Sequence, residues 1–96
     1  MKRISLLTEC GEFCTERSHP KLPELRSLVE TAVKTKTAIR FDRMGVKIFS
    51  VSFVDELLSP TASAHSVESV LKYIEFTPPL EKLYLDQIER GVRLRK

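Results

Sequence analysis

Short runs of β-type residues alternate with helical patterns along this chain, and this order limits the folds that it can adopt. Runs rich in branched and aromatic residues occupy positions 3–8, 37–42, 46–49 and 71–76. Between and after them, helical patterns begin near Leu22, Ser52 and Leu80. The alternation predicts an α/β fold in which a single small sheet of about four strands has helices packed on it.

The first helical pattern is the clearest. Its apolar residues recur at three- and four-residue steps, at Leu22, Leu25, Leu28, Val29, Ala32 and Val33. Pro23 suits a first turn, and Lys34 and Lys36 suit the negative end of the helix dipole. We expect Gly91 to close the last helix. Pro60 either breaks the second helix or begins a further turn, and positions 61–69 predict a helix or a helix and loop.

The length of the chain allows one core. A domain of 96 residues buries about 60–65% of its unfolded surface, which is enough for a single core. No repeat or linker divides the sequence, so we expect one domain, residues 1–96, with a short basic tail at 90–96. No apolar run approaches the ~20 residues of a membrane span, and the N-terminus lacks the apolar core of a signal peptide. The expected location is cytoplasmic, away from any membrane.

The net charge of +3 is concentrated at the C-terminus. Positions 90–96 hold four of the 16 basic residues and no acidic one, which leaves 12 basic and 13 acidic residues in the rest of the chain. A nucleic-acid surface needs cations clustered on one face. The tail therefore indicates a solvated terminus, and a nucleic-acid-associated regulator that uses this tail stays open as an alternative.

The two cysteines do not indicate a metal site. Cys10 and Cys14 are accompanied only by His19 and His65, and these four residues lack the paired short spacings of a structural zinc site. Free thiols in a reducing compartment are the expectation. We expect neither a metal nor a cofactor.

The passage from strand to helix at 39–58 draws attention to one serine. Ser52 is predicted to cap the second helix, and Asp55 three residues later suits a return contact of the capping-box kind. At about 100° per residue, the apolar stripe leaves Asp55 and Glu56 pointing into solvent. Phe53 falls at the edge of the stripe, where it could serve as a half-exposed anchor for a partner.

Catalysis finds no support in the sequence. The residues around Ser52 do not form a G-x-S-x-G elbow, and nothing places either histidine beside this serine. A glycine-rich phosphate loop is absent as well, since the chain has only three scattered glycines. We expect no enzyme.

The same passage resembles the STAS-like domains, small bacterial relatives of the anti-sigma-factor antagonist domain that also forms the cytosolic part of sulfate transporters. The resemblance rests on Phe41-Asp42-Arg43-Met44-Gly45-Val46, on Ile48-Phe49 and on Ser52-Phe53-Val54-Asp55-Glu56-Leu57. Ser50, Val51 and Phe53 depart from the antagonists' Asp-Ser-Ser-Gly motif. Ser52 is retained at the position that is phosphorylated in the family's switches.

The resemblance implies a non-enzymatic interaction module of the STAS type. Its partner would be a regulatory protein, such as an anti-sigma-like protein or a histidine-kinase-type ATPase, met through residues 50–56. Ser52 is the candidate for phosphorylation, since a phosphate is favoured at a helix N-terminus. The candidate partner-binding residues are Asp42, Ser50, Phe53, Asp55 and Glu56. A self-associating structural protein, paired through an exposed sheet edge or the Phe53 face, stays open as a further alternative.

Overall fold

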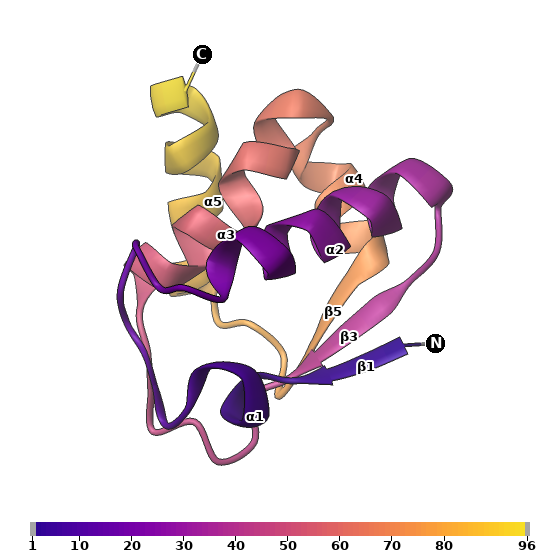
Figure 1. Ribbon diagram of the computed structural model, residues 1–96. Coiled ribbons are helices and arrows are strands. Elements are labelled where there is room, and N and C mark those ends of the chain that lie inside the picture. Colours follow the sequence, from indigo (N-terminus) through magenta and orange to yellow (C-terminus); the bar gives the residue numbers. More distant parts are fainter. Residues whose placement is uncertain (1, 96) are drawn as a thin grey trace.

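Three parallel strands form the centre of this protein, whose computed structural model describes residues 2–95. They lie in the order β1 (Lys2–Ser5), β3 (Ile39–Asp42) and β5 (Ile74–Thr77) (Figure 1). A second, two-stranded parallel sheet joins β2 (Phe13–Cys14) to β4 (Ile48–Phe49). The predicted α/β class is confirmed, but the described strands form two sheets rather than one of about four strands.

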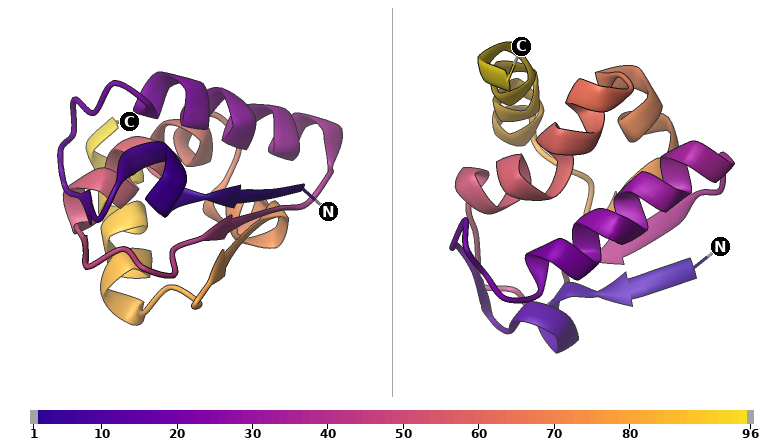
Figure 2. Two further views of the ribbon diagram at one scale, coloured as in Figure 1. Left: turned by 60° about the horizontal axis from the view of Figure 1, so that its bottom comes forward. Right: turned by 45° about the horizontal axis from the view of Figure 1, so that its top comes forward.

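The described helices are α1 (Leu6–Cys10), α2 (Leu22–Thr35), α3 (Val51–Ala64), α4 (Val67–Tyr73) and α5 (Lys82–Arg95). α2 and α4 contact β5 of the three-stranded sheet, α3 packs against α2, α4 and α5, and α1 follows β1 and contacts β1 and β3. In Figure 2, α2 lies across the sheet, and α5 stands at the side against α3. None of the helices within residues 2–95 is long and apolar enough to cross a membrane.

Strand alternation explains why only one face is covered. Ile4, Phe41 and Phe76 lie in one row of the parallel register and are buried, and the rings of Phe41 and Phe76 are 5.4 Å apart. Successive side chains point to opposite faces of a sheet. The other face therefore carries polar residues, including Arg40 and Glu75, whose charged atoms are 3.5 Å apart.

The first predicted strand is too long. β1 ends at Ser5, whose hydroxyl oxygen accepts a hydrogen bond from the Thr8 amide at 3.2 Å and so caps α1. Leu6 is fully buried in the first turn of this helix. A serine cap satisfies a free helix N–H, and this contact overrides the β propensity of the apolar run.

The second helix extends further than Pro60 suggested. α3 passes through this proline to Ala64, and α4 follows after a cap by Ser66, which accepts from the Ser69 amide at 3.0 Å. The segment 61–69 is therefore the end of one helix and the start of the next. Because α4 continues to Tyr73, β5 begins only at Ile74 and not at position 71.

The sequence predicts that the last helix ends at Gly91, and this prediction is wrong. α5 runs through it to Arg95, so the expected tail is helical over 90–95, and position 96 lies outside the described residues. A Cβ at Gly91 would overlap the Asp55 Oδ1 and Ser59 Oγ atoms of α3. Glycine is present here because it lets the two helices approach closely.

Arg43 contacts both β4 and the segment that leads into α5. Its Nε donates to the carbonyl of Pro78 at 2.8 Å, and its guanidinium lies 5.4 Å from the ring of Phe49 and 5.6 Å from that of Tyr84. The Tyr84 hydroxyl donates to the Phe49 carbonyl at 2.5 Å. These contacts join β4 to α5 beside the segment 50–56.

Candidate functional site

The corner segment, Ser50 to Glu56, joins β4 to the first turns of α3. Ser50, and not Ser52, caps the helix: its Oγ accepts from the Phe53 amide at 3.1 Å and donates to the Thr15 carbonyl at 3.0 Å. The Ser50 amide donates to the carbonyl of Cys14, also at 3.0 Å. The cap thus ties α3 to the chain that leaves β2, and the predicted cap at Ser52 is wrong.

Ser52 is the second residue of α3 and is half-buried. It precedes Glu56 by four residues, so the two side chains lie on the same side of the helix. The free N–H groups of a first helical turn extend to this position. Phosphorylation of Ser52 stays a prediction.

Phe53 belongs to the core. Its side chain is fully buried, with its ring centroid 5.8 Å from Phe49 and 6.1 Å from the edge-on ring of His19. The prediction of a half-exposed anchor is wrong, because the segment around His19 covers the side of α3 that the helical stripe had left open. In this conformation Phe53 offers no surface to a partner.

Asp55 and Glu56 form the centre of an ion-pair cluster with Arg17, Arg26 and Arg95. Arg17 lies 2.5 Å from Asp55 Oδ2, and Arg95 lies 3.2 Å from Asp55 Oδ1. Glu56 lies 3.0 Å from Arg17, 3.5 Å from Arg26 and 3.3 Å from Arg95. The side chain of Asp55 is only 5% exposed and that of Glu56 is 23% exposed. The prediction that both point into solvent is therefore wrong.

The ionised form of Asp55 is maintained in spite of its burial. Burial raises the pKa of this carboxyl, but the dipole of the Ser59 hydroxyl and the guanidinium groups of Arg17 and Arg95 together hold that pKa below its ordinary value. Ser59 is itself buried, and its Oγ has no well-aligned hydrogen-bond partner among the described residues. The cluster ties the loop before α2, α2 itself and α5 to α3.

Asp42 lies outside this cluster. It ends β3, and its Oδ1 accepts from the Met44 amide at 2.9 Å, which fixes the turn after the strand. In the sheet register it stands between Ser5 and Thr77. No hydrogen bond or ion pair in the described part of the chain joins Asp42 to the corner segment.

The sequence does not identify the arginines of the cluster. It predicts that Arg95 lies in a solvated tail, and it gives no role to Arg17 or Arg26. The one available signal was the spacing of Gly91 and Arg95, which puts a small residue and a cation one turn apart on the same helix. This spacing suits a helix that packs closely on an acidic neighbour.

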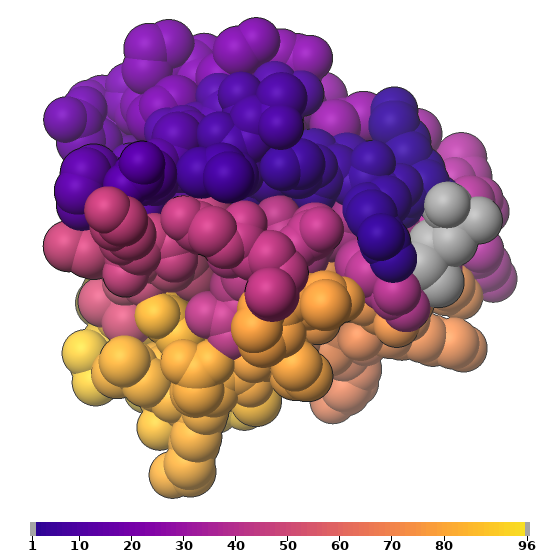
Figure 3. All heavy atoms as spheres, turned by 90° about the horizontal axis from the view of Figure 1, so that it is seen from below, coloured from indigo at the N-terminus to yellow at the C-terminus, as the bar shows by residue number. Residues whose placement is uncertain are grey.

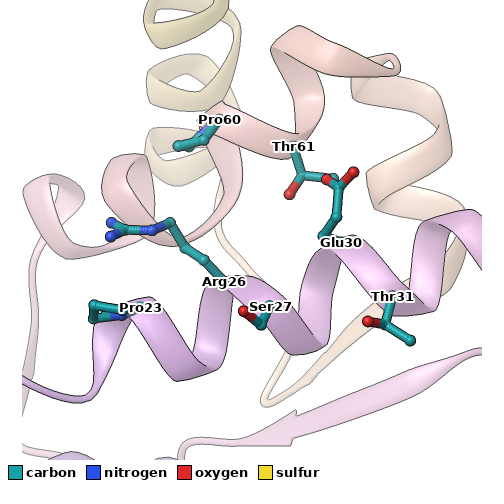
Figure 4. A pocket seen from close by; sticks show the side chains of 7 residues that line it. All are labelled: Pro23, Arg26, Ser27, Glu30, Thr31, Pro60 and Thr61. Carbon is teal, nitrogen blue, oxygen red and sulfur yellow. The ribbon is translucent and has the colours of Figure 1, made fainter.

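A polar groove of about 420 Å³ lies between α2 and α3 (Figure 4). Arg26 reaches from α2 toward α3 in this view, and Glu30 points toward Thr61. Both charges have partners, Arg26 with Glu56 and Glu30 with His65 at 3.0 Å. The hydrogen bond from His65 lowers the pKa of Glu30. Because the groove is open and its charges are paired, it indicates no ligand.

An apolar patch on the surface adjoins the corner segment. Phe13 and Ile48 are partners in the β2–β4 register and are 55% and 51% exposed. Met44 is 62% exposed, and Leu7, 39% exposed, lies against Gly45. Figure 3 shows the molecule from below, where the indigo N-terminal and magenta central segments lie side by side. We call the neighbouring pair Phe13 and Ile48 the apolar patch.

Neither a metal site nor a similarity to known proteins assigns a function to the described residues. No group of three or more histidine, cysteine or acidic side chains within residues 2–95 is arranged to hold a metal ion. Comparison of the chain with family models, curated proteins and solved structures found no match.

Proposed function

We propose that this chain is a non-enzymatic interaction module that docks a regulatory protein through the apolar patch and the adjoining corner segment. The observation that carries this proposal is the pairing of Phe13 with Ile48, which exposes two large apolar side chains next to one another. Contiguous exposed apolar side chains are typical of interaction sites, and aromatic residues supply much of the energy of small interfaces.

The charge beside the patch indicates the chemistry of the partner. The ion-pair cluster holds three guanidinium groups against two carboxylates, and the side chain of Arg17 is 50% exposed. Arg17 follows Phe13 by four residues, so their Cα atoms are at most ~14 Å apart. A partner that offers apolar side chains to the patch and a carboxylate to Arg17 would match both features. The STAS-like resemblance favours an anti-sigma-like protein or a histidine-kinase-type ATPase.

Phosphorylation of Ser52 would act on the same surface. A phosphate there would meet the free N–H groups of the first turn of α3. It would also compete with Glu56 for Arg17, since Ser52 and Glu56 lie one helical turn apart. We propose that this exchange of Arg17 between two anions changes the affinity for the partner.

The test compares matched surface substitutions. Phe13→Ser and Ile48→Ser remove apolar side chains from the patch, and Leu94→Ser removes one that is 76% exposed on the last turn of α5. A pull-down with the wild-type chain first isolates the ATPase or other regulator. The purified regulator is then titrated with each variant, and calorimetry gives the Kd of each complex. Each patch variant is expected to bind about tenfold more weakly, which corresponds to the ~1.4 kcal/mol of one lost apolar contact. Leu94→Ser should bind like the wild type.

Three outcomes would contradict the proposal. Equal binding by all variants would place the docking site elsewhere on the chain. Sedimentation of the wild type as a dimer that Ile48→Ser dissociates would make a second copy the occupant of the patch. If no regulator binds the folded wild type, the docking function itself fails.

A further inference from the structure

The fold brings the two cysteines of the chain together. Cys10 is the last residue of α1, and Cys14 is the second residue of β2. Gly11 reverses the chain between them with a φ of 85°, and its amide donates to the Leu7 carbonyl at 2.9 Å. The Cys14 thiol folds back over this turn and donates to the Gly11 carbonyl at 3.7 Å. The Cys14 thiol therefore lies over the residue that directly follows Cys10.

The two thiols differ in exposure and in acidity. Cys10 is half-buried, whereas Cys14 is fully buried. The hydrogen bond between the thiols lowers the pKa of Cys10 and raises that of Cys14. Burial and Glu9 oppose the effect at Cys10, and Lys21 adds to it. The thiolate is the reactive form, and because Cys14 is buried, a dissolved oxidant reaches the sulfur of Cys10 first.

We propose that Cys10 and Cys14 form a peroxide-sensitive dithiol that closes reversibly to a disulfide. The Cys10 thiolate attacks one oxygen of hydrogen peroxide, the O–O bond breaks, and the products are a Cys10 sulfenic acid and hydroxide. The Cys14 sulfur then attacks the Cys10 sulfur, the S–S bond forms, the S–O bond breaks, and hydroxide leaves. With the two thiol protons the products are a disulfide and two waters, so two electrons pass from the thiols to the peroxide.

The disulfide would form next to the corner segment. Phe13 lies inside the five-residue ring that it closes, and the Cys14 carbonyl holds the amide of Ser50 at 3.0 Å. Oxidation would therefore restrain the backbone on which part of the apolar patch is built. The dithiol chemistry itself does not depend on what docks on the patch.

The experiment treats the folded wild-type chain with hydrogen peroxide and then alkylates the remaining thiols. We expect both thiols to be lost together, the mass to fall by two hydrogens, and a reductant to restore both. Peptide mapping should place the bond between Cys10 and Cys14 in the monomer. A Cys14→Ala variant should accumulate a sulfenic acid at Cys10 that dimedone traps, and a Cys10→Ser variant should react more slowly than the wild type.

The oxidation rate of the folded chain is compared with that of the unfolded chain. Because the contact between the thiols depends on the α1–β2 turn, oxidation of the wild type should be faster in buffer than in concentrated urea at the same pH. This measurement needs no variant and holds even if Cys14→Ala does not fold. Oxidation that is faster in urea, bonds mainly between molecules, or an oxidised Cys10 beside a reduced Cys14 would each overturn the proposal.

Discussion

Arg95 places its guanidinium 3.2 Å from the buried carboxylate of Asp55, although the two residues are 40 positions apart in the sequence. Arg17 occupies the other carboxylate oxygen at 2.5 Å. Asp55 therefore joins the loop before α2 and the end of α5 to the N-terminal part of α3. This position makes it a structural residue of the corner segment as well as a neighbour of the proposed docking surface.

Replacement of Asp55 by Asn should destabilise the domain. The substitution leaves two guanidinium groups without their buried anion. We expect a loss of about 2 kcal/mol at neutral pH, less than the ~3–5 kcal/mol of a fully buried pair, because Arg17 and Arg95 both reach water. Urea unfolding followed by circular dichroism measures the loss. The exposed variant Asp86→Asn is the control and should unfold like the wild type.

The stabilisation by Asp55 should depend on pH in the acid range. The pKa of Asp55 is lowered in the folded state, so near the ordinary aspartate value of about 3.9 the unfolded chain binds more protons than the folded chain. The contribution is complete above that value and is lost as the pH falls through the folded-state pKa. Unfolding free energies at pH 7 and pH 3 should therefore differ less for Asp55→Asn than for the wild type. An equal difference in the two proteins would show that Asp55 does not carry this linkage.

Replacement of Gly91 by Ala should destabilise the domain even though alanine favours helices. The added Cβ would overlap Asp55 Oδ1 and Ser59 Oγ and would lie 2.9 Å from Ser59 Cβ, so the two side chains must leave their positions or α5 must move away from α3. Overpacking of this kind costs about 1–3 kcal/mol, more than the ~1 kcal/mol that alanine gains in helix propensity. The exposed variant Glu89→Ala, two residues earlier, should be neutral. Thermal unfolding compares the two, and a more stable Gly91→Ala protein would contradict the close contact of the helices.

The two serines of the corner segment should respond differently to replacement by alanine. Ser50→Ala removes the cap of α3 and its bond to the Thr15 carbonyl, so we expect a loss of about 1 kcal/mol. Ser52→Ala should change the unfolding free energy by less than about 0.5 kcal/mol, the range of ordinary surface substitutions. A larger effect at position 52 than at position 50 would reverse the assignment of the cap.

Phe53→Ala should affect folding before it affects binding. The side chain is fully buried against Phe49 and His19, and removal of a buried phenylalanine costs about 3–5 kcal/mol. Loss of binding by this variant would therefore reflect unfolded protein, which a parallel unfolding curve would reveal. A native-like unfolding curve for Phe53→Ala would contradict the burial of this ring.

The hydrophobic spacing of the sequence identified the main elements but not their ends. The pattern from Leu22 to Val33 predicted α2 closely, because every residue that decides it lies within a few turns of the next. Boundaries failed where a serine cap competed with local propensity. Ser5 stops β1 early, and Ser50 starts α3 two residues before the predicted cap.

The apolar stripe of the corner segment predicts that α3 buries one side only. In the structure α3 packs against α2 on one side and α5 on another, so even the polar Asp55 and Ser59 are buried. A periodicity of 3.6 residues reports only how many sides of a helix are apolar. The periodicity does not show that α5 covers a polar side of α3 and pairs Arg95 with Asp55 there.

The sequence by itself determined the α/β class and the order of most helices and strands, because these follow from contacts within short stretches of chain. The tertiary structure alone decided which serine caps α3, that Phe53 is covered, and that Asp55 meets Arg17 and Arg95. It also decided that Phe13 and Ile48 stand exposed together. Each of these outcomes depends on elements about 35–40 residues apart in the sequence, whose approach is fixed only when the whole core packs.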